Sequence, residues 1–124
     1  MTIQIDHFLH TAVLVSDLGQ AEQFYGTVLG LPKVDRILRF PGAWYQLGAV
    51  QIHLIADTPS LATPKNSEQS AKWGRNAHLA LAVADIQAAR DHLVSYGYEV
   101  QSSASGRAAL FVKDPDGNII ELSE

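Results

Sequence analysis

The sequence predicts an α+β protein built from two similar modules, each with the element order strand, helix, strand, strand, strand. Two observations carry this prediction. An apolar run that begins with His and ends with Asp-Leu or Asp-Ile occurs twice, at His10–Leu18 and His78–Ile86. These runs start 68 residues apart, and the same interval separates His53 from Glu121 in two later apolar runs. Self-similarity at a fixed interval indicates a repeated supersecondary unit.

The first module is expected to open with a strand at Phe8–Val15. Asp17 follows as a helix N-cap, because a short carboxylate accepts hydrogen bonds from the free backbone N–H groups of a first helical turn. Apolar residues then recur at helical spacing as far as Gly30, which ends the helix. The remaining strands are predicted at Leu38–Phe40, Ala43–Leu47 and Val50–Ile55.

The second module repeats this order, with a strand at Ala77–Val83 and a helix that Asp85 caps at its N-terminus and Gly97 ends. Its remaining strands are predicted at Glu99–Gln101, Ala108–Val112 and Ile119–Leu122. Asp114–Asn118 reads as a turn, since its Pro fixes φ and its Gly and Asn tolerate positive φ.

The length of 124 residues indicates one domain, 1–124. We expect module one at about 6–56, a connector at about 57–76 and module two at about 77–124. The Ser-, Thr-, Pro- and Lys-rich stretch Ala56–Asn76 is also a candidate flap over a site.

Composition excludes several classes of function. The net charge is −4 and no basic cluster occurs, which argues against a nucleic-acid partner. The chain has no cysteine, so disulfides and thiolate chemistry are excluded. No apolar run approaches the roughly 20 residues that a membrane-spanning helix needs. The first residues lack the pattern of a signal peptide, and a cytoplasmic protein without a membrane partner is expected.

The alternation of side chains within the strands places four polar residues on the strand faces that are turned away from the helices. In a strand, residues i and i+2 share a face. His10, His53, His78 and Glu121 therefore lie opposite the aliphatic positions that pack on the helices. Three imidazoles and one carboxylate are a suitable ligand set for one divalent ion such as Zn²⁺, Ni²⁺, Co²⁺, Fe²⁺ or Mn²⁺. We expect the four residues to converge on one cavity, within one subunit or across a dimer.

Four further residues are candidates for substrate binding. Trp44 either lines the cleft or packs in the core. Three arginines could hold a substrate carboxylate or phosphate by paired hydrogen bonds, or lie solvated on the surface; they are Arg39, Arg75 and Arg107.

The sequence resembles the vicinal oxygen chelate superfamily, which includes glyoxalases, bleomycin resistance proteins and extradiol dioxygenases. Three motifs carry the resemblance: His10-x₆-Asp17-Leu18, Phe24-Tyr25-x₃-Leu29-Gly30-Leu31, and Asp114-Pro-Asp-Gly-Asn118-x₂-Glu121-Leu122. The resemblance implies paired βαβββ modules that form a cupped, barrel-like mixed sheet with the helices outside. It also implies a divalent metal held by His10, His53, His78 and Glu121, and a homodimer.

The function that the resemblance implies is a metal-dependent glyoxalase-like lyase or isomerase, similar to lactoylglutathione lyase. Its substrate would be a small α-oxygenated molecule chelated to the metal. Glyoxalase I usually carries Glu at the position of His53, so Glu121 is the remaining candidate for a catalytic base. Two alternatives stay open: a non-catalytic, drug-sequestering binding protein of the bleomycin-resistance type, and a ring-cleaving dioxygenase.

Overall fold

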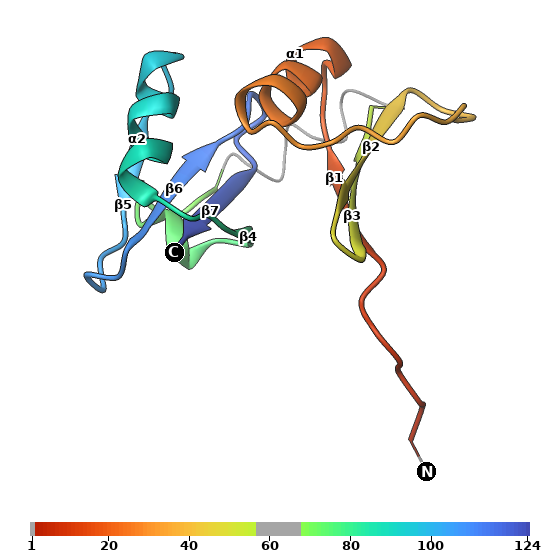
Figure 1. Ribbon diagram of the computed structural model, residues 1–124, viewed down its shortest axis with the longest axis horizontal. Coiled ribbons are helices and arrows are strands. Elements are labelled where there is room, and N and C mark those ends of the chain that lie inside the picture. Colours follow the sequence, from red (N-terminus) through yellow and green to blue (C-terminus); the bar gives the residue numbers. More distant parts are fainter. Residues whose placement is uncertain (1, 57–67) are drawn as a thin grey trace.

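Two mixed β-sheets, one in each half of the chain, form the framework of the protein (Figure 1). The computed structural model describes residues 2–56 and 68–124. The first sheet has the strand order β1-β3-β2, from β1 (His10–Leu14), β2 (Gly42–Leu47) and β3 (Val50–Ile55). The second has the order β4-β7-β6-β5, from β4 (His78–Ala82), β5 (Val100–Ser102), β6 (Ala109–Lys113) and β7 (Ile119–Ser123). The helical elements are α1 (Leu18–Glu22), the π-helix η1 (Gln23–Val28), the 3₁₀ turn η4 (Trp73–Arg75) and α2 (Ile86–Ser95).

The two sheets are built in the same register. Strand β1 pairs with β3 in parallel, with Ala12 opposite His53. Strand β4 pairs with β7 in parallel, with Ala80 opposite Glu121. The two pairings coincide when the positions are shifted by 68, so the repeat read from the sequence is present in the strand pairing.

The helix of the first half holds one residue more than its counterpart. The distance from Asp17 to Gly30 is 13 residues, whereas Asp85 and Gly97 are 12 apart. Helix α1 continues into η1, where the N–H of Leu29 donates to the carbonyl of residue 24. A π-turn of this kind accommodates a single inserted residue without breaking the helix.

The ends of both helices follow the sequence signals. The carboxylates of Asp17 and Asp85 accept hydrogen bonds from backbone N–H groups three residues later, at 3.0 Å in each case. Both predicted N-caps are confirmed. Gly30 and Gly97 follow the helices at φ of 73° and 87°, a backbone region that favours glycine.

The predicted strand at Leu38–Phe40 is wrong, because these residues form no strand. The corresponding edge of the first sheet lies earlier in the chain, where Lys33 makes a single bridge to Tyr45. Pro32 has no N–H to donate, so pairing there is limited to its carbonyl and to the N–H of residue 34. Residues 57–67, which include most of the predicted flap, lie outside the described residues.

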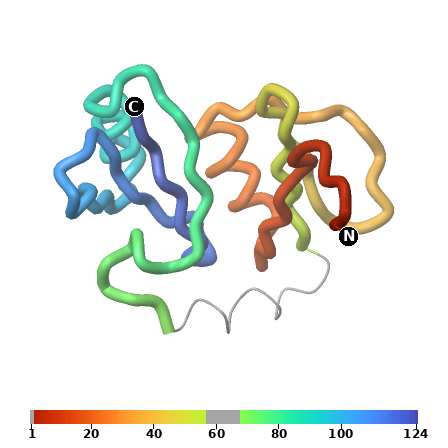
Figure 2. The backbone as a smooth tube through the Cα atoms, turned by 90° about the horizontal axis from the view of Figure 1, so that it is seen from below, coloured from red at the N-terminus to blue at the C-terminus, as the bar shows by residue number. Residues whose placement is uncertain are grey.

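One hydrophobic core joins the two halves. It contains side chains from the inner faces of both sheets and from the helices, among them Val15, Phe24, Tyr25, Leu54, Leu93, Leu110 and Ile120. In the views of Figures 1 and 2 the two sheets lie side by side, and α1 and α2 lie on the same side of the molecule. The predicted α+β class and cupped arrangement are confirmed, although the two sheets do not close into a barrel.

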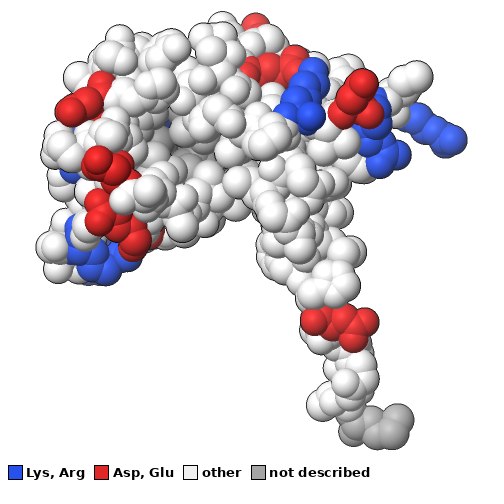
Figure 3. All heavy atoms as spheres, in the orientation of Figure 1, with Lys and Arg blue, Asp and Glu red and all other residues white. Residues whose placement is uncertain are grey.

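The surface shows no segregation of charge on the face seen in Figure 3, where acidic and basic side chains lie in small mixed groups. Residues 2–9 extend away from the body of the protein and are exposed. No helix among the described residues is long and apolar enough to cross a membrane.

A buried carboxylate in the β6–β7 turn connects the two halves. Asp114 is 4% exposed, and its carboxylate accepts four hydrogen bonds. Three come from within the turn, from the backbone N–H groups of Asp116 and Asn118 and from the side-chain amide of Asn118. The fourth comes from the Tyr25 hydroxyl of η1, at 2.8 Å. Burial raises the pKa of Asp114, and these hydrogen bonds oppose the increase.

The same turn makes two further bonds to the first half. The amide of Asn118 donates to the carbonyl of Leu14 at 3.0 Å, and the N–H of Ser16 donates to the Asp116 carboxylate at 3.0 Å. The turn therefore holds the end of β1 as well as η1. Its Asp-Pro-Asp-Gly-Asn sequence both reverses the chain and joins the modules.

We predict that Tyr25→Phe lowers the free energy of unfolding by about 2 kcal/mol, because a hydrogen bond to a buried carboxylate is lost. Urea denaturation of the wild type and the variant measures this difference. Tyr45→Phe is the matched control: Tyr45 is also buried in the core, and its hydroxyl makes no hydrogen bond to the described residues. Equal losses in the two variants would show that the Asp114 bond contributes nothing specific.

Candidate metal and substrate site

His10 and His53 form a pair on the first sheet. His53 is opposite Ala12 on the neighbouring strand, which places His10 and His53 on the same face. Their rings stack with centroids 4.0 Å apart and an interplanar angle of 16°. His10 is exposed, whereas His53 is only 7% exposed.

The stack continues across β2. Trp44 is the cross-strand neighbour of His53, and the two rings are 3.8 Å apart and almost parallel. The guanidinium of Arg36 lies over the indole, 4.1 Å from the ring centroid. The indole Nε1 of Trp44 is buried without a hydrogen-bond partner among the described residues. Trp44 thus supports the histidine pair rather than packing in the core.

The surroundings of His53 favour its neutral form. Burial lowers the pKa of His53 below its ordinary value, and the neighbouring His10 and Arg36 lower it further. Its Nε2 lies 2.8 Å from the side-chain oxygen of Gln51. Neutral imidazole is the form that binds a metal ion.

His78 and Glu121 form the equivalent pair on the second sheet. The Nε2 of His78 lies 3.3 Å from Oε1 of Glu121, and Nδ1 of His78 lies 2.7 Å from the carbonyl of Asn76. The other carboxylate oxygen of Glu121 is 3.5 Å from Nη1 of Arg107. Phe111, the cross-strand neighbour of Glu121, makes a T-shaped contact with the His78 ring, with the ring centroids 5.4 Å apart.

The structure places the four predicted ligands in two pairs rather than in one cluster. Among the described residues of one chain, no three His, Cys, Asp or Glu side chains are close enough to hold one metal ion. The pairs are separate because each lies on its own sheet, and the sheets do not close around a common cavity.

The predicted arginines have different positions. Arg107 contacts Glu121, and together with Arg75 it lines an open groove of about 890 Å³ that also reaches His78. Arg39 is exposed and contacts neither pair. The arginine beside the first pair is Arg36, which the sequence analysis did not identify as a candidate. Arg36 lies in a loop, where no strand or helix periodicity indicates the direction of its side chain.

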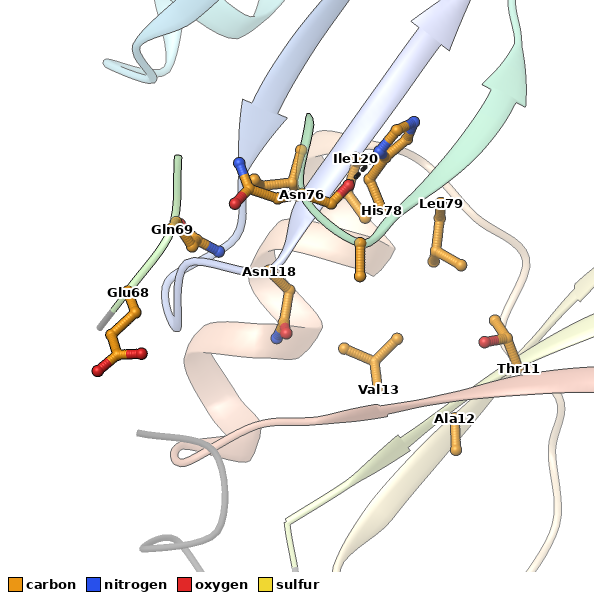
Figure 4. A pocket seen from close by; sticks show the side chains of 12 residues that line it. Thr11, Ala12, Val13, Glu68, Gln69, Asn76, His78, Leu79, Asn118 and Ile120 are labelled. Atoms are coloured by element: carbon orange, nitrogen blue, oxygen red, sulfur yellow. Dashed lines mark hydrogen bonds between the residues drawn. The ribbon is translucent and has the colours of Figure 1, made fainter. Parts of the chain in front are cut away.

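A second groove, of about 360 Å³, lies where β1 and β4 face each other. Figure 4 shows side chains of β1, β4 and β7 around it, with a dashed line joining His78 to Asn76. Of the four predicted ligands, only His78 lines this groove. The outer strands of the two sheets therefore border a space that one of the four predicted ligands, His78, reaches.

Comparison with known proteins agrees with this architecture. A probable lactoylglutathione lyase of Synechocystis sp. (strain ATCC 27184 / PCC 6803 / Kazusa) is 29% identical over 127 residues, covering 92% of each chain. A structure from Bacillus anthracis, assigned to the glyoxalase family, is 25% identical with a TM-score of 0.74, covering 98% of this chain and 97% of that one. An antibiotic-binding protein from Streptomyces sp. CB03234 shares the fold at 24% identity and a TM-score of 0.71, covering 98% of each chain.

The sequence profile of one family matches residues 5–122, which is nearly the whole chain. The match includes the three histidine-bearing strands β1, β3 and β4, the helices α1 and α2, and the turn that joins the halves. The chain therefore belongs to the glyoxalase/bleomycin resistance protein/dioxygenase superfamily.

Proposed function

We propose that the protein is a divalent-metal-dependent lyase or isomerase of the glyoxalase type, acting on a small α-oxygenated substrate. The family and the relative named a probable lactoylglutathione lyase support this class of activity. The observation that carries the proposal is the hydrogen bonding of His78 beside Glu121.

The carbonyl of Asn76 can only accept a hydrogen bond, so Nδ1 of His78 carries the proton. The Nε2 of a neutral His78 then presents a lone pair 3.3 Å from the carboxylate oxygen Oε1 of Glu121. Two such atoms repel each other unless a cation or a proton lies between them. A histidine that donates one ring N–H to a backbone carbonyl and leaves the other nitrogen open is typical of metal ligands.

We propose that this pair is completed by His10 and His53 of a second copy of the chain. Each chain carries one pair of ligands on its first sheet and a different pair on its second sheet. A two-fold axis would place the first-sheet pair of each chain against the second-sheet pair of the other, which gives two sites. The resulting set of three imidazoles and one carboxylate fits Zn²⁺, Ni²⁺, Co²⁺, Fe²⁺ or Mn²⁺. A homodimer would then hold two equivalent sites.

In this arrangement Glu121 has the role of catalytic base. When bound, the metal supplies Lewis acidity that stabilises negative charge on the chelated substrate oxygens. Released from the metal, the Glu121 carboxylate would accept a proton from the substrate carbon and return it to the neighbouring position. Arg107 holds the second oxygen of that carboxylate from the solvent side, and its exposed guanidinium is also available to an anionic group of the substrate.

A second candidate function is small-molecule binding without catalysis. An apolar groove of about 490 Å³ lies between the halves, bordered by η1, β4 and α2 and lined by leucines such as Leu29, Leu31, Leu81 and Leu93. An antibiotic-binding protein has the same fold. A purified protein that lacks metal and binds apolar drugs would favour this function over the first.

The proposal of a shared site predicts that two metal-free variants regain one site in a mixed dimer. One chain carries His10→Ala with His53→Ala, and the other carries His78→Ala with Glu121→Gln. In the mixed dimer one site combines the intact His78 and Glu121 of the first chain with the intact His10 and His53 of the second. The other site has lost all four ligands. Zn²⁺ content, measured by mass spectrometry after purification through a different tag on each chain, should be about one ion per mixed dimer.

Each variant alone is the control and should bind no Zn²⁺ stoichiometrically, whereas the wild-type dimer should bind two ions. A mixed dimer without Zn²⁺, beside a wild type that binds it, would place each site within a single chain. A wild type that remains monomeric with Zn²⁺ bound would likewise place the site within a single chain.

We predict that Glu121→Gln lowers turnover about 100-fold or more while a measurable fraction of the metal remains bound. The amide keeps the shape and an oxygen ligand but loses the charge and the basicity. His53→Ala should reduce turnover less, since three ligands remain. Steady-state assays with hemithioacetals, epimerisable acids and catechols, alongside metal analysis, check both variants; an unchanged turnover in Glu121→Gln would exclude Glu121 as the base.

A further inference from the structure

Two glutamine side chains connect His53 to the backbone of the β2–β3 turn. The side-chain oxygen of Gln51 lies 2.8 Å from Nε2 of His53. The side-chain amide of Gln51 donates to the side-chain oxygen of Gln46 at 2.7 Å. The amide of Gln46 in turn donates to the backbone carbonyl of Gly48 at 2.7 Å, with the carbonyl of Val50 at 3.5 Å.

The strand register accounts for this chain of contacts. Gln51 and His53 are two residues apart on β3 and share a face. Gln46 is the cross-strand partner of Gln51, as Trp44 is of His53. The two glutamines therefore extend the row of side chains that supports His53 on one face of the first sheet.

The direction of each hydrogen bond follows from the turn. The carbonyl of Gly48 can only accept, so Gln46 must present its NH₂ group there and its oxygen to Gln51. Gln51 must then present its NH₂ to Gln46 and its oxygen to His53. An oxygen acceptor requires a donor opposite it, so Nε2 of His53 carries the proton.

We propose that Gln46 and Gln51 form a relay that fixes His53 as the Nε2–H tautomer and leaves Nδ1 as its metal-binding nitrogen. This rests on the proposed metal site. The two glutamines are positioning residues, since they act through His53.

The aromatic stack does not perform this task. Stacking on His10 and Trp44 fixes the plane of the His53 ring, but it does not distinguish between the two ring nitrogens. The bond to Gln51 does distinguish them. His78 has the opposite arrangement, because its Nδ1 donates to a backbone carbonyl and its Nε2 faces the Glu121 carboxylate at 3.3 Å. The two halves of the site would thus offer different nitrogens to the metal.

The tautomer is measured in the metal-free protein by long-range ¹H–¹⁵N correlation spectra of the imidazole rings. The signals of His53 are assigned by their loss in His53→Asn. We expect wild-type His53 to be protonated at Nε2 alone. A wild-type His53 that is protonated at Nδ1, or that averages between the two tautomers, would overturn the proposal.

Variants test whether the relay causes this state. Gln51→Leu should give averaged ¹⁵N shifts for His53, and so should Gln46→Leu, although residue 46 does not touch His53. Gln51→Glu should keep the Nε2–H form, because a carboxylate only accepts. Gln23→Leu, an exposed position of η1, is the matched control and should leave the spectrum unchanged. Unchanged His53 signals in Gln51→Leu and Gln46→Leu would overturn the relay.

Zn²⁺ titration tests which nitrogen binds the metal. If Nδ1 binds, Gln51 supports the ligand through the opposite N–H, and Gln51→Leu should weaken Zn²⁺ binding about 10- to 100-fold. If Nε2 binds, Gln51 competes with the metal, and the same variant should bind equally or more tightly, which would overturn the assignment of Nδ1. A wild type that binds no Zn²⁺ would refute the proposed metal site and with it the role of Nδ1, while the spectra would still decide the tautomer.

Discussion

The buried carboxylate of Asp114 is the interaction on which the arrangement of the two halves depends. It orders its own turn through three hydrogen bonds and accepts the fourth from Tyr25 in the other half. A buried carboxylate needs this number of donors, because taking its charge out of water is costly. The position of β7 relative to β1 and η1 follows from where these donors lie, and the core that spans both halves packs around that contact.

The candidate site follows from the strands that this contact holds. Equal register in the two sheets places a pair of polar side chains at the same location on each, next to an aromatic cross-strand neighbour, Trp44 or Phe111. The pairs differ in how the chain supports them. A backbone carbonyl orients His78, whereas an aromatic stack and side-chain amides orient His53. Neither pair has enough donors to hold a metal ion alone.

The sequence predicted what depends on local pattern: the repeat, the side-chain faces and the helix caps. It did not predict what depends on distant contacts. The strand expected at Leu38–Phe40 was displaced because the edge of the sheet pairs at Lys33. The turn at Asp114 was recognised as a turn, but its bond to Tyr25 joins residues 89 positions apart and has no periodic signature. Arg36 and the glutamine relay likewise depend on cross-strand geometry.

In the proposed dimer each chain carries two halves of a metal site, and a second chain completes them. Anomalous diffraction from crystals grown with Zn²⁺ tests it most directly, because the anomalous peak locates the ion and its ligands independently of activity. We expect a peak bound by His10 and His53 of one chain and by His78 and Glu121 of the other chain. A Zn²⁺ ion held by all four residues of one chain, or one bound away from these residues, would contradict it.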